Sequence, residues 1–279
     1  MDSLVTTDWL ADNLSAPDLR VLDASYFLPE HGRDAANEYR AGHIPGAAFM
    51  DLASFADQTS PLPSMTPTAE IASARLGALG IGGDTRVVVY DASPLHSAAR
   101  AWWVLRLFGA HQVAILDGGL EKWSAEGRPL ATDTVPPETR SFKARKDAVS
   151  VRTLDDMVAN LTSHSEQVID ARSPARFEGR EPEARPNTAA GHIPGARNLH
   201  YATLFNADGS WKRGDALREA FTDCGVALDR PIVATCGSGI TAAVLVFGGH
   251  LLGHDIALYD GSWSEWGADP TTPKATGAA

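Results

Sequence analysis

The chain has 279 residues, of which 44% are hydrophobic and 21% are charged, and its formal net charge is −11. This composition is typical of a globular protein, and no run reaches the roughly 18 apolar residues that a membrane-spanning helix requires. Nucleic-acid binding needs clustered Lys and Arg, so this acidity argues against it. The two cysteines, Cys224 and Cys236, suggest neither a disulfide framework nor a zinc site, so we expect no metal and no cofactor.

The first residues, Met1 to Asp8, contain neither a basic region nor an apolar core, so no cleaved signal is expected. So few cysteines also suit a reducing compartment. We therefore expect a cytoplasmic enzyme with neither a membrane nor a nucleic acid as partner.

Short β-branched runs alternate with longer amphipathic stretches along the chain. Arg20 to Asp23, Arg86 to Tyr90 and Val113 to Leu116 are typical of buried strands, and apolar residues at helical spacing predict a helix from Ala98 to Phe108. Strands that alternate with helices predict an α/β fold, in which a parallel sheet carries helices on both faces.

The sequence also repeats itself. Residues Ala41 to Ala47, Ala-Gly-His-Ile-Pro-Gly-Ala, recur without change as Ala190 to Ala196. The flanking segments match in the same order, at offsets of 143 to 149 residues. The matching pairs are Val21 to Ala24 with Val168 to Ala171, Val87 to Asp91 with Ile232 to Cys236, and Leu116 to Gly118 with Tyr259 to Gly261.

A repeat of about 130 residues suits one domain. We therefore expect an N-terminal domain over residues 1–135 and a C-terminal domain over residues 151–279. The segment 136–150 is expected to be the linker between them, because it begins with Pro136 and Pro137, carries several charges and lacks a clear apolar period.

Cys236 follows the predicted strand Ile232 to Thr235, and a helix is expected to begin near Thr241. The loop between them places backbone N–H groups around the sulfur, and Gly237 and Gly239 permit the positive φ angles that such a loop requires. Each hydrogen bond to a charged group is worth about 1.5–3 kcal/mol, against about 0.3–1 kcal/mol from a helix N-terminus. The loop is therefore expected to stabilise a thiolate more than the helix does.

A cysteine at the end of a buried strand is alternatively a small core residue. Cys224 has no comparable loop, and we expect it to be structural. In the first repeat Asp91 stands where the second has Cys236. A carboxylate cannot carry sulfur as a persulfide, so only the second domain is expected to be catalytic.

Five features together resemble the two-domain rhodanese family of sulfurtransferases over nearly the whole chain. They are the duplicated Gly-His-Ile-Pro-Gly-Ala, Tyr90-Asp91-Ala92-Ser93, Trp102-Trp103, Leu116-Asp117-Gly118-Gly119 and Tyr259-Asp260-Gly261-Ser262-Trp263. The resemblance implies two tandem rhodanese-like domains and sulfur transfer through a persulfide on Cys236.

The active-site loop distinguishes two branches of this family. Members that use thiosulfate have a loop resembling Cys-Arg-Lys-Gly-Val-Thr, whose cations suit a dianion. Here the loop is uncharged and is similar to the 3-mercaptopyruvate sulfurtransferase branch, except that Ile240 replaces the usual valine. We therefore expect 3-mercaptopyruvate as the sulfur donor, with thiosulfate as the alternative, and a thiol such as thioredoxin, or cyanide, as the acceptor.

The resemblance also assigns individual roles. Arg176 and Arg185 correspond to the family's substrate-binding arginines, and guanidinium forks suit a carboxylate beside a keto oxygen. Taken alone, this Arg- and Glu-rich segment favours a solvated run of charges over a substrate site, and the resemblance to the family reverses that preference. The remaining site is expected to comprise Cys236 and Ser238 as catalytic residues and Gly237, Gly239, Ile240 and Thr241 as the active-site loop.

In one place the chain departs from its branch. Other members often carry an acidic residue and a histidine, proposed to relay protons, where this chain has Ala53 and Ser64. Neither side chain can serve as a charged relay, and whether the nearby Asp51 replaces them is left open. The duplicated His43 and His192 are expected to be structural, because they recur in the half that has no cysteine.

A cysteine phosphatase and a non-catalytic sulfur-binding protein are the alternative functions. A cysteine phosphatase would need an arginine that closes the loop, where Ile240 and Thr241 stand. A non-catalytic sulfur-binding protein would fit the missing acid and histidine, and mass spectrometry after incubation with mercaptopyruvate would separate it from a sulfur carrier.

Overall fold

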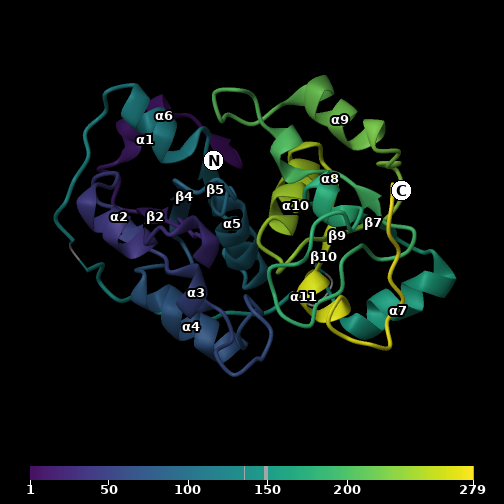
Figure 1. Cartoon of the computed structure of the whole chain (residues 1–279). Coiled ribbons are helices and arrows are strands. Elements are labelled where there is room, and N and C mark those ends of the chain that lie inside the picture. Colours follow the sequence, from purple (N-terminus) through teal and green to yellow (C-terminus); the bar gives the residue numbers. More distant parts are fainter. Residues whose placement is uncertain (135, 148–149, 279) are drawn as a thin grey trace. The chain divides into compact units, whose positions relative to one another are not determined.

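The structure is a computed structural model that describes residues 1–134, 136–147 and 150–278. The chain divides into two compact units (Figure 1). The first comprises Met1–Gln58, Thr66–Asp147 and Asn206–Trp211, and the second comprises Thr59–Met65, Ala148–Phe205 and Lys212–Ala279. Among the described residues, no helix has both the length and the apolar character needed to cross a membrane.

The first unit contains a parallel sheet whose five strands lie in the order β1-β5-β4-β2-β3 within residues 1–134 and 136–147. The strands are β1 (Leu4–Val5), β2 (Leu19–Asp23), β3 (Ala48–Phe49), β4 (Arg86–Tyr90) and β5 (Val113–Leu116). The helices are α1 (Thr7–Asn13), the 3₁₀ helix η1 (Pro29–His31), α2 (Ala35–Ala41), α3 (Leu52–Phe55), α4 (Ala69–Ala78), α5 (Ala98–Leu107) and α6 (Gly119–Ala125).

The second unit contains a parallel sheet in the order β6-β10-β9-β7-β8, again five strands among its described residues. The strands are β6 (Val151–Arg152), β7 (Gln167–Asp170), β8 (Arg197–Asn198), β9 (Ile232–Thr235) and β10 (Ala257–Tyr259). The helices are α7 (Leu154–Ser163), α8 (Pro174–Phe177), the 3₁₀ helix η3 (Tyr201–Leu204), α9 (Gly214–Asp223), α10 (Ala242–Leu251) and α11 (Ser262–Trp266).

The strand order is the same in both units when the strands are numbered within each unit. This agreement confirms the internal repeat and the α/β class of parallel sheets covered by helices. The predicted strands occur as β2, β4 and β5, and the predicted helix as α5, each within one residue of its expected bounds. Central strands such as β4 are covered on both faces, which explains why Val87, Val88 and Val89 form an apolar run without alternation.

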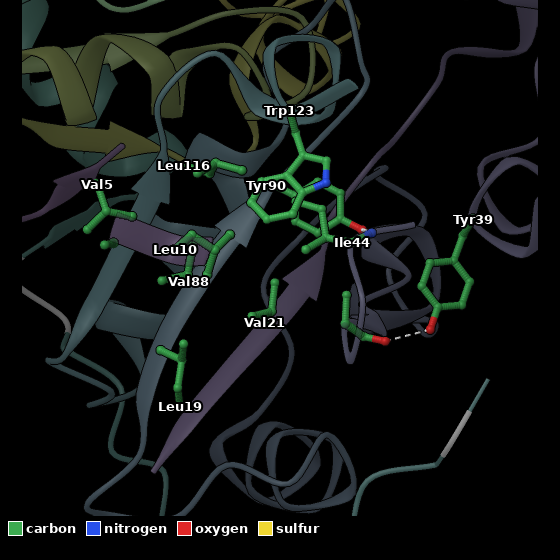
Figure 2. Packing of buried hydrophobic residues seen from close by; sticks show 12 residues of the cluster. Val5, Leu10, Leu19, Val21, Tyr39, Ile44, Val88, Tyr90, Leu116 and Trp123 are labelled. Atoms are coloured by element: carbon green, nitrogen blue, oxygen red, sulfur yellow. Dashed lines mark hydrogen bonds between the residues drawn. The ribbon is translucent and has the colours of Figure 1, made fainter. Parts of the chain in front are cut away.

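The core of the first unit joins its sheet to the flanking helices. Figure 2 shows Val21 of β2 and Val88 of β4 packed in one cluster with Trp123 of α6. Within this cluster, the polar atoms of Tyr39, Tyr90 and Trp123 have hydrogen-bond partners. The Tyr39 hydroxyl donates to the carbonyl oxygen of Ala47 at 2.7 Å, as the dashed line in Figure 2 marks. Such bonds offset the cost of burying a polar group.

The two repeated histidines make the same kinds of contact in each unit. His43 lies on the ring of Tyr39 with 4.1 Å between centroids, and its Nδ1 is 2.7 Å from the Tyr39 carbonyl oxygen. His192 lies on Phe177 at 3.8 Å and contacts the Phe177 carbonyl oxygen at 2.8 Å. Both are buried. These contacts join each histidine, two residues before Pro45 or Pro194, to the end of the preceding helix, and the structural role stays a prediction.

The expected linker contains neither helix nor strand in its described part, 136–147. Hydrogen bonds nevertheless attach it to the first unit, because the Arg140 amide donates to the Gly77 carbonyl at 2.9 Å and the Ala144 amide donates to the Ser73 hydroxyl at 3.0 Å. Residues 135, 148 and 149, at the predicted domain boundaries, lie outside the described residues, and the boundaries stay a prediction.

Candidate active site

The candidate site lies at the carboxyl end of the central strand β9. From β7 the chain continues outward to β8, whereas from β9 it continues to β10 on the opposite side. The loops after β7 and β9 therefore diverge, and ligands of parallel sheets generally bind where neighbouring loops diverge in this way. Cys236 directly follows β9, and Ala171 and Arg172 directly follow β7.

Cys236 is buried, with 2% of its surface exposed. The amide N–H of Gly239 donates to its sulfur, with 3.1 Å between the nitrogen and Sγ. Gly239 has a φ of 80°, a conformation that glycine adopts without strain, and α10 begins directly after Thr241. A bond of this kind to a thiolate is worth about 1.5–3 kcal/mol. The loop therefore directs a backbone N–H group at the sulfur.

Gly237 does not have the backbone conformation that the sequence suggested. Its φ is not positive, so the expectation of a left-handed conformation there was wrong. A Cβ atom on Gly237 would lie 3.3 Å from Nη2 of Arg176, so a larger residue here would require the end of that side chain to shift by a few tenths of an ångström. The Arg176 guanidinium therefore lies directly against the loop, one residue from the sulfur-bearing Cys236.

The segment at the start of α11 grips the loop from the other side. The Trp263 amide donates to the Cys236 carbonyl at 2.9 Å, and both the amide and the hydroxyl of Ser264 donate to the Gly237 carbonyl, at 2.9 and 2.5 Å. The Cys236 amide in turn donates to Oγ of Ser262 at 3.3 Å. With its carbonyls and first amide bound to this segment, the loop is held in one conformation.

Ser262 adopts a backbone conformation that serine rarely takes. Its φ is 51° and it is fully buried, and its counterpart in the first unit, Gly119, has a φ of 58°. A non-glycine residue in this region costs about 1–2 kcal/mol. The Ser262 hydroxyl accepts a hydrogen bond from the Cys236 amide. We infer that this bond offsets the free-energy cost of the strained backbone.

Two substitutions of Ser262 separate the strain from the hydroxyl. Ser262→Ala keeps the strain and loses the hydroxyl, and we expect it to lower the free energy of unfolding by about 1–3 kcal/mol. Ser262→Gly loses the hydroxyl but relieves the strain, so it should be more stable than Ser262→Ala by about 1 kcal/mol. Urea unfolding curves measure the difference, and equal stability of the two variants would contradict the strain argument.

Four charged side chains of alternating sign extend from β7 to the loop. Arg172 is buried and donates from Nε and Nη2 to the carboxylate of Asp170, at 2.6 to 3.1 Å. Its Nη1 donates to Oε1 of Glu183 at 2.8 Å. The other carboxylate oxygen of Glu183 accepts from Nη2 of Arg176. The order of charges is therefore Asp170, Arg172, Glu183, Arg176.

The burial of Arg172 is compensated by these neighbours. Burial disfavours its charge, but the carboxylates of Asp170 and Glu183 more than offset this and raise the pKa of Arg172 above its ordinary value. Its guanidinium also lies 4.5 Å from the ring centroid of Trp263, the residue that binds the Cys236 carbonyl. The charged group that follows β7 thus contacts the segment that holds the sulfur-bearing loop.

The other predicted site residues differ in their surroundings. Ser238 is nearly buried, and its hydroxyl has no hydrogen-bond partner among the described residues. Ile240 and Thr241 are buried at the start of α10. Arg185 is exposed and forms no ion pair within the part of the chain that the structure describes. No contact links Arg185 to the loop, so its assignment as a substrate-binding residue stays a prediction.

The positions expected for a proton relay lie in different units. Ala53 is an exposed residue of α3 in the first unit, and Ser64, whose φ is 59°, belongs to the second. The carboxylate of Asp51 accepts from the Ala53 amide at 3.0 Å and caps α3. Asp51 therefore has a structural role already.

Asp91, at the position equivalent to Cys236, serves its own unit. Its carboxylate is buried and accepts from the amides of Ser93 at 2.9 Å and Ala98 at 2.6 Å, so it binds the first turn of α5. Burial raises the pKa of Asp91 to about 7. The loop that surrounds a sulfur in the second unit surrounds a helix-binding carboxylate in the first.

Glu183, Ser262 and Ser264 were not predicted from the sequence. Glu183 lies in the same charged run as Arg176, where an acidic residue reads as solvated. A signal for Ser262 did exist, since the repeat aligns it with Gly119, and a glycine at that position suggests a positive φ.

The chain was compared with known proteins. The model of the Rhodanese-like domain matches residues 6–126 and 153–269. The chain is 44% identical over 271 residues to a human protein named 3-mercaptopyruvate sulfurtransferase, covering 95% of this chain and 91% of that one. It is 40% identical over 274 residues to a thiosulfate sulfurtransferase of Cricetulus griseus, with coverages of 95% and 91%.

The fold is shared as well. The crystal structure of SseA from Escherichia coli, a 3-mercaptopyruvate sulfotransferase, matches with a TM-score of 0.86 and 38% identity, covering 94% of this chain and 99% of that one. Two matched domains, the close relatives and the common fold lead to one conclusion. The chain belongs to the rhodanese family and contains two Rhodanese-like domains.

Proposed function

We propose that this protein transfers sulfur from 3-mercaptopyruvate to a thiol or cyanide acceptor through a persulfide on Cys236, releasing pyruvate. The observation that carries the proposal is a buried thiol on an uncharged loop, with the Arg176 guanidinium against the adjacent Gly237. This arrangement supplies a nucleophile and, beside it, one cation for the carboxylate of a small donor. Relatives named 3-mercaptopyruvate sulfurtransferase support the choice of donor.

In the first half-reaction, Arg176 and Arg185 hold the carboxylate and keto oxygen of mercaptopyruvate. The Cys236 thiolate attacks the substrate sulfur, a sulfur–sulfur bond forms, and the carbon–sulfur bond breaks. The electron pair of the broken bond leaves with pyruvate as its enolate, which takes up a proton that Ser238 donates or relays. The amide of Gly239 stabilises the charge on sulfur before and after this step.

In the second half-reaction, an acceptor thiolate attacks the outer sulfur, and Cys236 leaves as a thiolate. Two half-reactions on one nucleophile give ping-pong kinetics. A protein thiol such as thioredoxin is the proposed acceptor, and cyanide serves in an assay. The cytoplasm is the proposed compartment, and both cysteines are free in the structure, as a reducing compartment requires.

The donor is tested by comparing kcat/KM for mercaptopyruvate and thiosulfate. We expect mercaptopyruvate to be preferred by at least about tenfold, because a loop without cations loses a charge-assisted bond worth about 1.5–3 kcal/mol to the dianion. A clear preference for thiosulfate would replace the proposed donor with the alternative, thiosulfate:cyanide sulfurtransfer.

A further inference from the structure

Glu183 is a buried carboxylate between two guanidinium groups. Only 5% of its side chain is exposed, Oε1 accepts from Arg172 at 2.8 Å, and Oε2 accepts from Arg176. A buried carboxylate is stable only where cations and donors compensate the lost water. Both of its oxygens are thus committed, one to each arginine.

The two arginines differ in how firmly they are held. Arg172 is 1% exposed, binds Asp170 through two nitrogens, donates to the Gly191 carbonyl at 2.8 Å and stacks on Trp263. The Arg176 side chain is 33% exposed, and Glu183 is its ion-pair partner within the described residues. The bond to the immobile Arg172 therefore restrains Glu183. Glu183 in turn restrains the guanidinium of Arg176.

In the proposed function, the sulfur donor binds to the Arg176 guanidinium in this restrained position. Nη2 of Arg176, the atom that Glu183 accepts from, is also the atom 3.3 Å from the site of a Cβ on Gly237. One bond to Glu183 leaves the other N–H groups of the five-donor guanidinium available to a substrate carboxylate. Without Glu183, Arg176 would sample several rotamers, and ordering it would weaken binding.

The charge of Glu183 also bears on the choice of donor. Asp170, Arg172, Glu183 and Arg176 sum to zero charge, so this series adds no net positive charge beside the uncharged loop. A monoanion can bind through the oriented guanidinium of Arg176 although the net charge of these four side chains is zero. A dianion gains more than a monoanion from a net positive charge. Removing the charge of Glu183 is therefore expected to weaken binding of the monoanion through Arg176 and not to weaken binding of the dianion.

We propose that Glu183 is a positioning residue that holds Arg176 against the Cys236 loop and thereby favours a monocarboxylate donor over a dianion. This inference rests on the proposed function. It adds a residue that does not itself contact the reacting atoms and acts through Arg176.

The test is steady-state kinetics of Glu183→Gln with both donors. We expect KM for mercaptopyruvate to rise about ten- to a hundredfold with kcat within about twofold, while kcat/KM for thiosulfate stays the same or rises. Glu181→Gln is the matched control, because Glu181 is exposed in the same segment, and it should behave as the wild type. Unchanged KM, or an equal loss for both donors, would overturn the proposal.

A double-mutant cycle tests the route through Arg176. If Glu183 acts by positioning Arg176, Glu183→Gln adds no further increase in KM to Arg176→Ala, whereas additive effects would refute the proposal. Glu183→Asp keeps the charge and serves if the Gln variant does not fold, with an expected KM between those of wild type and Arg176→Ala. If the wild type itself releases no pyruvate from mercaptopyruvate, the proposed function fails instead.

Discussion

Replacing Cys236 by serine is expected to lower kcat/KM for pyruvate release from mercaptopyruvate by more than about 10⁴-fold. A serine hydroxyl cannot accept sulfur as a persulfide, so the step is lost and not merely slowed. Coupling the released pyruvate to NADH oxidation by lactate dehydrogenase measures the rate. Intact-protein mass spectrometry supplies the second measurement, because a persulfide adds about 32 Da to the wild type and nothing to the variant.

Cys224→Ser is the matched control. Cys224 is half-buried, its sulfur contacts the Phe221 carbonyl oxygen at 3.0 Å, and burial raises the pKa of its thiol. A thiol that stays protonated is a poor nucleophile, so this variant should retain both the activity and the mass increase. Pyruvate release by Cys236→Ser at a rate near that of the wild type would refute the persulfide mechanism.

Replacing Arg172 by methionine is expected to lower the free energy of unfolding by about 3–5 kcal/mol. The substitution leaves the carboxylates of Asp170 and Glu183 buried without the cation between them, and it leaves the Gly191 carbonyl without its donor. Such a loss is a large part of the stability of an ordinary domain. The midpoint of urea unfolding, followed by tryptophan fluorescence, measures it.

Arg180→Met provides the comparison. Arg180 pairs with Glu178, but its side chain is 62% exposed, so water replaces the partner and the expected loss is small compared with that of Arg172→Met. Equal destabilisation by Arg172→Met and Arg180→Met would mean that the buried series of charges contributes no more than a surface pair.

The repeat in the sequence predicted much of this molecule. Identical segments at nearly constant offsets led to two domains of one topology, and β-branched runs led to the strands that the structure contains as β2, β4 and β5. Both inferences succeed because periodicity and repetition can be read from the order of the residues without knowledge of tertiary contacts. The same alignment placed Cys236 at the end of a strand and showed that Asp91 takes its place in the other half.

The tertiary structure alone decided how the loop is held. Cys236 and Ser262 are 26 residues apart, and Gly237 touches Arg176 across a still longer separation; these contacts exist because parallel strands bring the loops after β7, β9 and β10 to one edge of the sheet. The hydrophobic periodicity of the sequence does not predict contacts between residues so far apart in the chain. For this reason the sequence did not predict the conformation of Gly237, nor that Glu183 is buried between two arginines.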